Sequence, residues 1–236
     1  MDYKDYKAGM TEKHFWFQGK AGLIDVLLSK LDSNKNLKIL DIGAGTGQDL
    51  EVINKYGSVY VLDIEQNALD LIPDQMVQDK KLGDACFIPY SDNSFDLVVS
   101  FDVLEHIPDD KKVTQEVARV LKPGGAFIFT VPAFKFLYGN HDRELGHARR
   151  YDKKLIRSLL RDNFKQESLG FWLFFLFLPA SIQRLFNLNF VNSGKKMPRF
   201  INTIFSKVLS FENWLISKGL NFPLGLSVYG IYKVKK

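Results

Sequence analysis

The sequence predicts an α/β fold in which a mostly parallel sheet is covered by helices on both faces. Two observations favour this class. From residue 37 to residue 132, short and almost wholly apolar runs alternate with helical segments, and a glycine-rich turn follows the first run. The 236 residues are 46% hydrophobic and 25% charged, a composition that excludes wholesale disorder. We therefore expect one domain spanning residues 1–236.

The expected elements of the first half follow from the spacing of apolar residues and from turn signals. A polar start leads into a helix with apolar positions from Leu23 to Leu31, and apolar runs then mark each strand. Pro123-Gly124-Gly125 turns the chain into a strand that Pro132 ends. We expect strands at 37–42, 58–62, 95–101 and 126–131, and helices at 23–31, 48–56, 66–71 and 111–121.

The second half begins with a loop at 134–151 that is dense in His, Asp and Arg. A helix at 153–160, a strand at 164–171, a helix at 198–218 and a last strand at 226–234 follow from their apolar patterns. Residues 171–190 contain six Phe and one Trp. We divide the chain into an N-terminal helical cap (1–36), a ligand-binding core (37–132) and an acceptor-side region (133–236) with an insertion at about 171–222.

Cysteine content and hydropathy indicate the compartment. The single cysteine, Cys86, excludes an internal disulfide and a Cys-based zinc site. The N-terminus is polar, and the longest uncharged stretch, Ser168–Gln183, has 16 residues and is interrupted by Pro179. A membrane-spanning helix needs about 20 residues. We therefore expect a cytoplasmic protein.

Acidic residues at strand ends outline a nucleotide-like site. The first strand leads into Asp41-Ile-Gly-Ala-Gly-Thr-Gly47, where glycines allow a tight turn and close approach of a ligand. The third glycine comes one residue earlier than in the dinucleotide pattern GxGxxG, and Asp41 favours a cationic amino group over a pyrophosphate. Asp63 ends the second strand, where an acid binds ribose hydroxyls, and Asp84 can accept from a purine amino group. An amino acid, a ribose and an adenine together make S-adenosylmethionine.

Four segments of the sequence resemble the successive motifs of class I S-adenosylmethionine-dependent methyltransferases. They are LDIGAGTG (Leu40–Gly47), VLDIE (Val61–Glu65), GDACFIPYSDNSFDLVVSFDVLEHI (Gly83–Ile107) and LKPGGAFIFTVP (Leu121–Pro132). The resemblance implies a Rossmann-like sheet of seven strands with an antiparallel last strand. It also implies transfer of a methyl group with release of S-adenosylhomocysteine.

The resemblance places the cofactor residues position by position. Asp41, Gly43 and Ala44 lie by the methionine moiety, Gly45 and Gly47 at the backbone turn, Asp63 on the ribose, Ile64 against the adenine, Asp84 and Ala85 at the adenine amino group, and Phe101 near the sulfonium. The N-terminal HFWF (His14–Phe17) is similar to a segment that closes over the cofactor in many relatives. The alternative for HFWF is a hydrophobic plug at the start of a helix.

Histidines are the candidate bases for methylation of a hydroxyl, because that reaction must also remove a proton. His106 follows Glu105, and His147 lies in the segment Tyr138–Tyr151. We expect His147 and His106 as catalytic residues. Asp102, Glu105 and His106 form D-x-x-E-H, which is similar to the magnesium-binding E-x-x-E-H of some quinone O-methyltransferases. Because the first position is Asp and the substrate region does not match, we expect no metal.

The segment Tyr138–Tyr151 is the candidate acceptor site. It resembles the D-x3-GHxRRY pattern of a bacterial and archaeal branch of these methyltransferases, which also carries an N-terminal HxWF and a C-terminal E…PxGxS, met by Glu212, Pro223, Gly225 and Ser227. Arginine forks suit phosphate or carboxylate. We expect the acceptor to contact His141, Asp142, Arg149, Arg150 and Tyr151. The alternative is a surface loop held by its own salt bridges.

The C-terminal third is the candidate region for contact with an anionic partner. From Lys195 to Lys236 the chain has eight Lys or Arg residues and one acid, Glu212. The aromatic stretch Leu169–Ile182 is either a buried helix covering the sheet or an apolar wall that receives a lipid tail, with Lys195, Lys196 and Arg199 beside the headgroups. A peripheral membrane contact and a basic solvated face both fit this charge pattern.

The function expected from the sequence is methyl transfer to a small-molecule, glycan or lipid-linked acceptor, at oxygen. N- or C-methylation of a small metabolite is an alternative within the same class. A catalytically silent cofactor-binding module that acts through a partner or a membrane surface is an alternative from another class. Nucleic acid is disfavoured as a partner, because an Asn-Pro-Pro-Tyr-type motif and basic residues interleaved with stacking aromatics are both missing.

Overall fold

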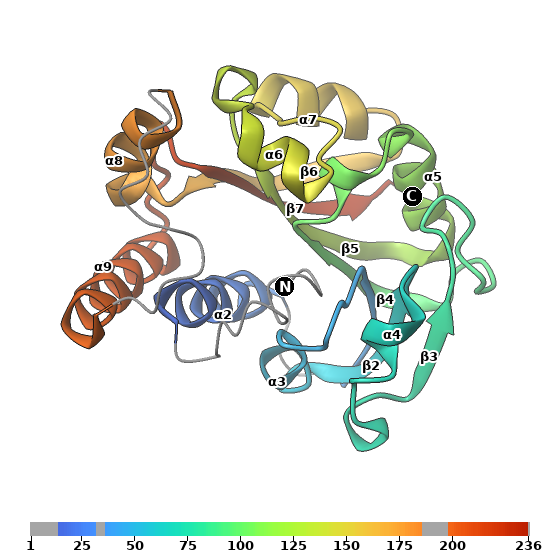
Figure 1. Ribbon diagram of the computed structural model, residues 1–236. Helices are drawn as coiled ribbons and strands as arrows, with labels where there is room; N and C mark the ends of the chain where they lie inside the picture. Colours follow the sequence, from blue (N-terminus) through green and yellow to red (C-terminus); the bar gives the residue numbers. More distant parts are fainter. Residues whose placement is uncertain (1–13, 32–35, 186–197, 236) are drawn as a thin grey trace.

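One sheet of seven strands forms the centre of the molecule, in the order β3-β2-β1-β4-β5-β7-β6 (Figure 1). The computed structural model describes residues 14–31, 36–185 and 198–235. β7 is antiparallel to both of its neighbours, and the pairs from β3 to β5 are parallel. The expected Rossmann-like sheet with an antiparallel last strand is thus confirmed. The strands are β1 (Leu37–Ile42), β2 (Gly57–Asp63), β3 (Asp79–Leu82), β4 (Phe95–Phe101), β5 (Leu121–Pro132), β6 (Phe164–Trp172) and β7 (Ser227–Val234).

Helices cover both faces of the sheet. α2 and α3 pack against one face, with α9 packed against α2, and α5 and α7 pack against the other face (Figure 1). The helices are α2 (Phe15–Leu28), α3 (Leu50–Ile53), α4 (Gln66–Leu69), α5 (Asp110–Val120), α6 (Asn140–Leu145), α7 (Lys153–Leu160), α8 (Phe174–Leu185) and α9 (Arg199–Ser217). Short 3₁₀ turns are η1 (Asp74–Met76), η2 (Leu104–His106) and η3 (Lys135–Leu137).

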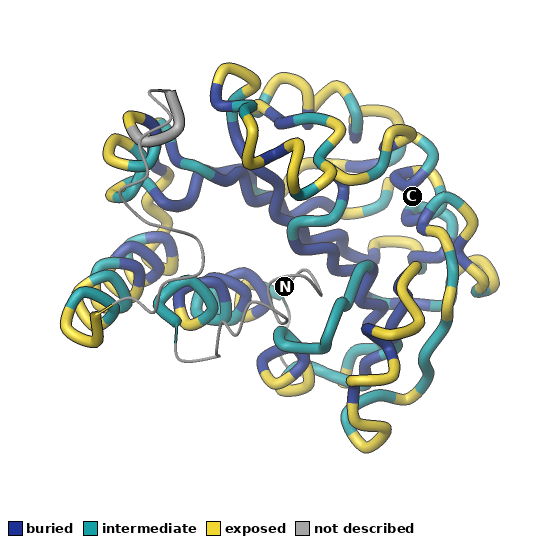
Figure 2. The backbone as a smooth tube through the Cα atoms, viewed as in Figure 1, coloured by how far each residue is buried: buried dark blue, intermediate teal, exposed yellow. Residues whose placement is uncertain are grey.

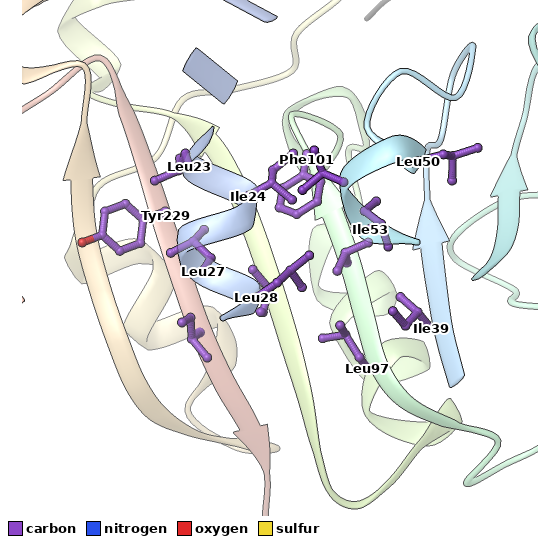
Figure 3. Close-up of a cluster of buried hydrophobic side chains, with 14 of the residues drawn as sticks. Leu23, Ile24, Leu27, Leu28, Ile39, Leu50, Ile53, Leu97, Phe101 and Tyr229 are labelled. Carbon is purple, nitrogen blue, oxygen red and sulfur yellow. The ribbon is translucent and has the colours of Figure 1, made fainter. Parts of the chain in front are cut away.

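The apolar stripe of α2 fixes how this N-terminal helix docks. Its residues at spacings of three and four belong to a buried apolar cluster that also contains Ile39 of β1, Leu97 of β4 and Tyr229 of β7 (Figure 3). The stripe is fully buried and consists of Leu23, Ile24, Leu27 and Leu28. The tube view shows the strands as the most buried part of the chain (Figure 2). α2 therefore packs firmly against the sheet.

Most strands lie within a few residues of their predicted positions, and β3 is the exception. Its residues Asp79-Lys80-Lys81-Leu82 are mostly polar, because β3 is an edge strand that pairs with β2 alone and stays partly exposed. Such a strand has no apolar run to reveal it. The helix expected at 48–56 is also shorter in the structure, where α3 has one turn.

The insertion between β6 and β7 consists of α8 and α9, and residues of the E…PxGxS pattern hold it to the sheet. The buried Glu212 of α9 accepts hydrogen bonds from the backbone N–H groups of Phe174 (2.9 Å) and Phe175 (3.4 Å), at the start of α8. At Gly225, an added Cβ would lie 2.2 Å from the carbonyl oxygen of Trp172. Glu212 and Gly225 thus have structural roles.

The outer side of the insertion is exposed. Phe175, Leu178 and Ile182 of α8 are each at least 41% exposed, so the expectation of a buried helix fails for this side of α8. Lys195 and Lys196 lie outside the described residues. Within the described ranges, no helix combines the length and hydrophobicity needed to cross a membrane.

Candidate functional site

In the glycine loop after β1, residues 43–47, the backbone is exposed to a ligand because the glycines carry no side chains. Gly43, Gly45 and Gly47 have φ angles of 72°, 54° and 79°, the left-handed region that favours glycine. A Cβ at Gly43 would lie 2.4 Å from a methyl carbon of Val103, so the loop lies against the segment that follows β4. The hydroxyl oxygen of Thr46 is buried without a hydrogen-bond partner. A ligand can therefore approach the backbone of this loop closely, and the hydroxyl of Thr46 is available to bond with it.

Asp63, at the end of β2, braces this loop. Its Oδ2 accepts from the backbone N–H of Gly45 (2.7 Å) and its Oδ1 from that of Glu65 (2.9 Å). Each carboxylate oxygen can accept a second hydrogen bond, so both remain able to receive a ribose hydroxyl. Ile64, the next residue, is 71% exposed, which is unusual for a large aliphatic side chain beside a buried acid. The acid and the aliphatic surface together suit a ribose with an attached base.

A buried lysine lies among the acids at this edge of the sheet, and the sequence analysis missed it. The Lys20 ammonium, carried by α2, lies 3.1 Å from Oδ2 of Asp49, 3.2 Å from Oδ2 of Asp102 and 5.8 Å from the ring centre of Phe101. Burial alone would lower the pKa of Lys20, but the two carboxylates outweigh burial and raise it. Lys20 escaped notice because its partners, Asp49 and Asp102, are distant in the sequence and leave no local signal in α2.

Asp41, at the end of β1, is buried beside this ion cluster. Burial, and then the negative charge of Asp49, raise the pKa of Asp41 to about 8, while Lys20 opposes the rise. The carboxyl of Asp41 is therefore largely protonated at neutral pH in the absence of a ligand. A cationic group beside it would favour its ionised form.

The remaining predicted cofactor residues lie around the same edge. Ala44 packs against the core beside the loop, and Phe101 ends β4 and is buried. Asp84 is exposed and caps its own turn, with Oδ1 accepting from the backbone N–H of Cys86 at 2.8 Å, while Ala85 is buried. These residues follow β1, β3 and β4, whose carboxyl ends meet at one edge of a parallel sheet.

The HFWF segment begins α2. His14 caps the helix, Phe15 packs edge-on against Phe205 of α9 (5.1 Å between ring centroids), and Trp16 contacts Trp172 (5.5 Å). These contacts are those of a plug at a helix start. A lid role for HFWF stays a prediction, and Lys20 is the residue of α2 that reaches the acidic edge.

On the acceptor side, Asp142 is the centre of a buried hydrogen-bond network. Its Oδ1 lies 2.9 Å from Nδ1 of His147 and accepts from Nε of Arg150 (2.8 Å), and its Oδ2 accepts from the backbone N–H of Gly139 (2.9 Å). Burial alone would raise the pKa of Asp142, but these hydrogen bonds lower it to about 2. Because a carboxylate only accepts, Nδ1 of His147 must carry a proton, which leaves Nε2 with a lone pair when the ring is neutral.

The neighbouring residues of the GHxRRY pattern point inward. Arg150 is buried and also donates to the carbonyl oxygen of Ala133 (3.1 Å). Tyr151 is fully buried, and its hydroxyl donates to Oδ2 of Asp110 (2.9 Å), which also accepts from Arg149 (2.8 Å). Direct contact with an acceptor was expected for these three residues. The structure uses the polar groups of Arg150 and Tyr151 internally, whereas the side chain of Arg149 stays 34% exposed and its contact with an acceptor stays a prediction. His141 lies exposed on α6.

The structure brings His147 to the second predicted histidine. The rings of His106 and His147 are perpendicular, with centroids 4.7 Å apart. Glu105 is buried close to both, and burial and then Asp102 raise its pKa well above the usual range. The backbone N–H of Ala148 donates to the carbonyl oxygen of Glu105 (2.6 Å), which ties the His147 segment to η2. Asp102 itself lies apart from the histidines, paired with Lys20 and with Thr130 (3.0 Å).

The acidic edge fits S-adenosylmethionine. Its donor set combines a glycine loop with an unpartnered buried hydroxyl, a carboxylate with free acceptor capacity, and an exposed aliphatic side chain. The cluster of Asp41, Asp49, Asp63 and Asp102 suits a ligand that carries a sulfonium and an ammonium group, and Lys20 suits that ligand's carboxylate.

Comparison with known proteins identifies the core. Residues 40–129 match a family model described as a methyltransferase domain. A demethylmenaquinone methyltransferase from Shouchella clausii is 33% identical over 127 residues, which are 47% of this chain and 54% of that protein. The chain thus spans about half the length of this curated relative.

Solved structures share the fold over almost the whole chain. One, from a complex between the Trm112 methyltransferase activator of Haloferax volcanii and a methyltransferase, has a TM-score of 0.65 and 17% identity, and covers 98% of this chain and 94% of that chain. Another, assigned as a sarcosine dimethylglycine methyltransferase from Galdieria sulphuraria, has a TM-score of 0.57 and 22% identity, and covers 89% and 83%. At these identities the likeness shows the fold.

Asp41 predicts an unusual dependence of stability on pH. Its ordinary pKa of 3.8 applies to the unfolded chain and a value of about 8 to the folded one, so the folded state holds a proton that the unfolded state releases between these pH values. Stability from this group is therefore present below pH 4 and is lost as pH rises toward 8. We expect ligand-free Asp41→Asn to be more stable than the wild type at pH 8 by at least about 1 kcal/mol, or roughly 2–4 °C in Tm, and nearly equal to it at pH 4.

Thermal unfolding followed by circular dichroism measures this difference. The matched control is Glu51→Gln, which neutralises an exposed acid on α3 and should leave the pH profile unchanged. A variant Asp41→Asn that is less stable than the wild type at pH 8 would mean that Asp41 is ionised and serves as a partner of Lys20.

Proposed function

Because the chain carries a class I, S-adenosylmethionine-dependent methyltransferase domain, we propose that it methylates an oxygen atom of a small or lipid-linked acceptor. The observation that supports oxygen is the pairing of His147 with the buried Asp142, 2.9 Å apart, on the acceptor side of the sheet. Such a pair orients an imidazole as a base for a hydroxyl proton. N- or C-methylation needs no strong base at this position.

In this proposal the acidic edge binds and orients the methyl donor. Asp63 receives the ribose hydroxyls, the backbone of Gly43–Gly47 lies along the methionine chain, and Asp41 and Lys20 meet its ammonium and carboxylate groups. When bound, S-adenosylmethionine supplies a methyl carbon activated by the sulfonium. Holding that carbon in line with the acceptor oxygen is the main contribution of the protein to the rate.

His147 then removes the proton of the acceptor. The hydroxyl proton would pass to Nε2 of His147 as the acceptor oxygen takes up the methyl group that bound S-adenosylmethionine would supply, with S-adenosylhomocysteine as the product. Asp142 keeps the ring in the tautomer with a proton on Nδ1 and stabilises the imidazolium that forms. Arg150 and the backbone N–H of Gly139 hold Asp142 in place, so Arg150 acts as a positioning residue.

An aromatic wall beside this segment supports an acceptor with an apolar part. Phe134 follows β5 and stacks on Phe171 of β6 (5.1 Å), and it also contacts Phe177 of α8 (5.6 Å) and Phe136 (5.3 Å). Phe136 remains largely exposed. The wall connects the acceptor segment to α8, the start of the exposed apolar surface of the insertion.

That surface is a stripe along α9, continued on α8. On α9, exposed residues recur at spacings of three and four, as in one face of a helix. They are Phe200 (68% exposed), Ile204, Lys207, Phe211, Trp214 and Lys218. The ring of Phe211 lies 6.2 Å from that of Phe175 on α8, beside the exposed Leu178 and Ile182. We call these nine residues the α8–α9 stripe.

Charge favours an anionic membrane as the partner of the α8–α9 stripe. α9 carries Arg199, Lys207 and Lys218, while its one acid, Glu212, is fully buried. Aromatic and aliphatic side chains flanked by basic ones are typical of helices that lie in the interface of anionic bilayers. A contact of this kind would bring lipid-linked acceptors to the aromatic wall.

The cofactor site is tested by calorimetry with S-adenosylmethionine and S-adenosylhomocysteine. We expect wild-type binding, and weakening by about 10- to 100-fold in Asp63→Ala, because charge-assisted hydrogen bonds are worth about 1.5–3 kcal/mol. Glu65→Gln, which neutralises the exposed neighbouring acid, should bind like the wild type. Equal affinity of Asp63→Ala and wild type would contradict the ribose role.

The acceptor side is tested by the transfer of a labelled methyl group to extracts of the source cells, separated into lipid and water-soluble fractions. We expect label in one fraction, a rate lower by about 10²- to 10⁴-fold in His147→Gln, and unchanged cofactor affinity. His141→Gln, which removes an exposed histidine of the same segment, should alter the dependence on acceptor concentration and keep the maximal rate.

Three other results of the transfer assay would each change the proposal. Full activity of His147→Gln would favour N- or C-methylation. Label confined to the water-soluble fraction would replace a lipid-linked acceptor by a small metabolite. Cofactor binding with no incorporation into either fraction would favour the silent module.

Membrane contact is tested by co-sedimentation with vesicles. We expect binding to mixed phosphatidylglycerol and phosphatidylcholine vesicles, little binding to phosphatidylcholine alone, and loss of at least about 10-fold in affinity in the double variant Phe200→Ser/Trp214→Ser, because each large side chain contributes about 1.5–3 kcal/mol on burial. Leu71→Ser, which removes an exposed apolar residue away from the stripe, is the control. Equal binding of both variants would rule out the α8–α9 stripe as the membrane contact.

A further inference from the structure

The cluster formed by Glu105, His106 and His147 has features that the base role of His147 does not explain. One potential ligand atom of each of the three side chains lies within 4.8 Å of the others. The set joins two residues of η2 to a residue more than 40 positions later, so it is a product of tertiary structure. It also differs from the D-x-x-E-H set of the sequence, because Asp102 faces Lys20 instead.

The side chain of Glu105 is a second, independent indication of a ligand-binding site. Its side chain is almost completely buried, at 1% exposure, and its Oε2 has no hydrogen-bond partner. Leaving a buried carboxyl oxygen unpaired costs free energy unless a proton, a donor or a cation meets it. The two nearby imidazoles and the carboxyl group present nitrogen and oxygen to the same point.

The hydrogen bond between His147 and Asp142 is of the kind found around metal-bound histidines. Such a histidine donates its other ring N–H to a carboxylate, which fixes the ring and makes the ligating nitrogen more basic. Asp142 receives Nδ1–H of His147 at 2.9 Å and is itself held by Arg150. Nε2 is thereby the ligand atom. The bond from Ala148 to Glu105 fixes the His147 segment against η2.

We propose that Glu105, His106 and His147 form a binding site for Zn²⁺ or a similar borderline divalent cation. Two imidazoles and one carboxylate are a zinc ligand set, and they leave a coordination position open to water or acceptor. Tetrahedral zinc separates its ligand atoms by about 3.4 Å, given bonds of about 2.1 Å. The ligand atoms, which lie within 4.8 Å of one another, must therefore approach by up to about 1.4 Å when the ion binds.

Occupation of this site would regulate the proposed methyl transfer. The lone pair of His147 Nε2 binds a proton or a metal ion but not both, so a bound cation removes the base. This consequence rests on the proposed function, whereas the binding of the ion does not. Zinc should then inhibit labelled-methyl transfer by the wild type without displacing S-adenosylmethionine.

Calorimetric titration of the full chain with Zn²⁺ tests the site itself. We expect one ion per chain, weakening of more than about 100-fold in His147→Gln and in Glu105→Gln, and about 10- to 100-fold in Asp142→Asn, which alters only the second shell. Each variant should still bind S-adenosylmethionine, which verifies that it is folded and keeps this test separate from that of the cofactor site.

Two controls remove other zinc ligands. His141→Gln removes an exposed histidine of the same segment and Cys86→Ser removes the single thiol, and neither should change zinc affinity. No zinc binding by the wild type at millimolar concentration would overturn the proposal. Binding that is lost in Cys86→Ser or His141→Gln, and kept in His147→Gln, would overturn it as well.

Discussion

The carboxyl edge of the sheet depends on one buried ammonium group. Asp41, Asp49, Asp63 and Asp102 gather where β1, β2 and β4 end, and Lys20 of α2 lies within 3.2 Å of two of them. Removing one partner of a buried ion pair is strongly destabilising, because a charge is then left without water or counterion. The ion pairs therefore fix where α2 docks, and they hold together the groups that surround the cofactor. Burial of the apolar stripe stabilises the docked helix, and the ion pairs of Lys20 fix its position along the sheet.

On the acceptor side, the buried carboxylate of Asp142 likewise holds several groups together, and here the central charge is negative. One buried carboxylate gathers an arginine, a histidine and a backbone N–H, and so turns a loop rich in charge into a fixed frame. Two arginines that would suit an anionic acceptor pair with acids of the protein instead: Arg150 with Asp142, and Arg149 with Asp110. The side chain of His147 is held in this network at 9% exposure, and its ring lies 4.7 Å from that of the exposed His106. The roles that we propose for His147, as a base and as a metal ligand, both rest on the hydrogen bond that it makes with Asp142.

The insertion between β6 and β7 connects the acceptor site to an exposed surface. Glu212 caps the start of α8 from α9, so the two helices are held to each other and to the end of β6. Rings of Phe134, Phe171 and Phe177 continue from the acceptor segment to α8, and the α8–α9 stripe continues outward. Residues 40–129 match a methyltransferase domain, and selection of the acceptor by the later half remains our proposal.

Most strands, the glycine loop and the acids at strand ends could be predicted from the sequence, because each is recognised from residues that are close together in the chain. The prediction failed for β3, since the polar run Asp79–Leu82 gains its strand partner only at the sheet edge. Three features became visible only in the folded structure. Lys20 pairs with acids at the carboxyl edge of the sheet, Arg150 and Tyr151 are buried, and Glu105 lies close to His147. The folded structure also shows that one side of α8 and α9 stays exposed. The physical reason is that periodicity fixes which face of an element is apolar, while the partners of a buried charge are set by residues far away in the chain.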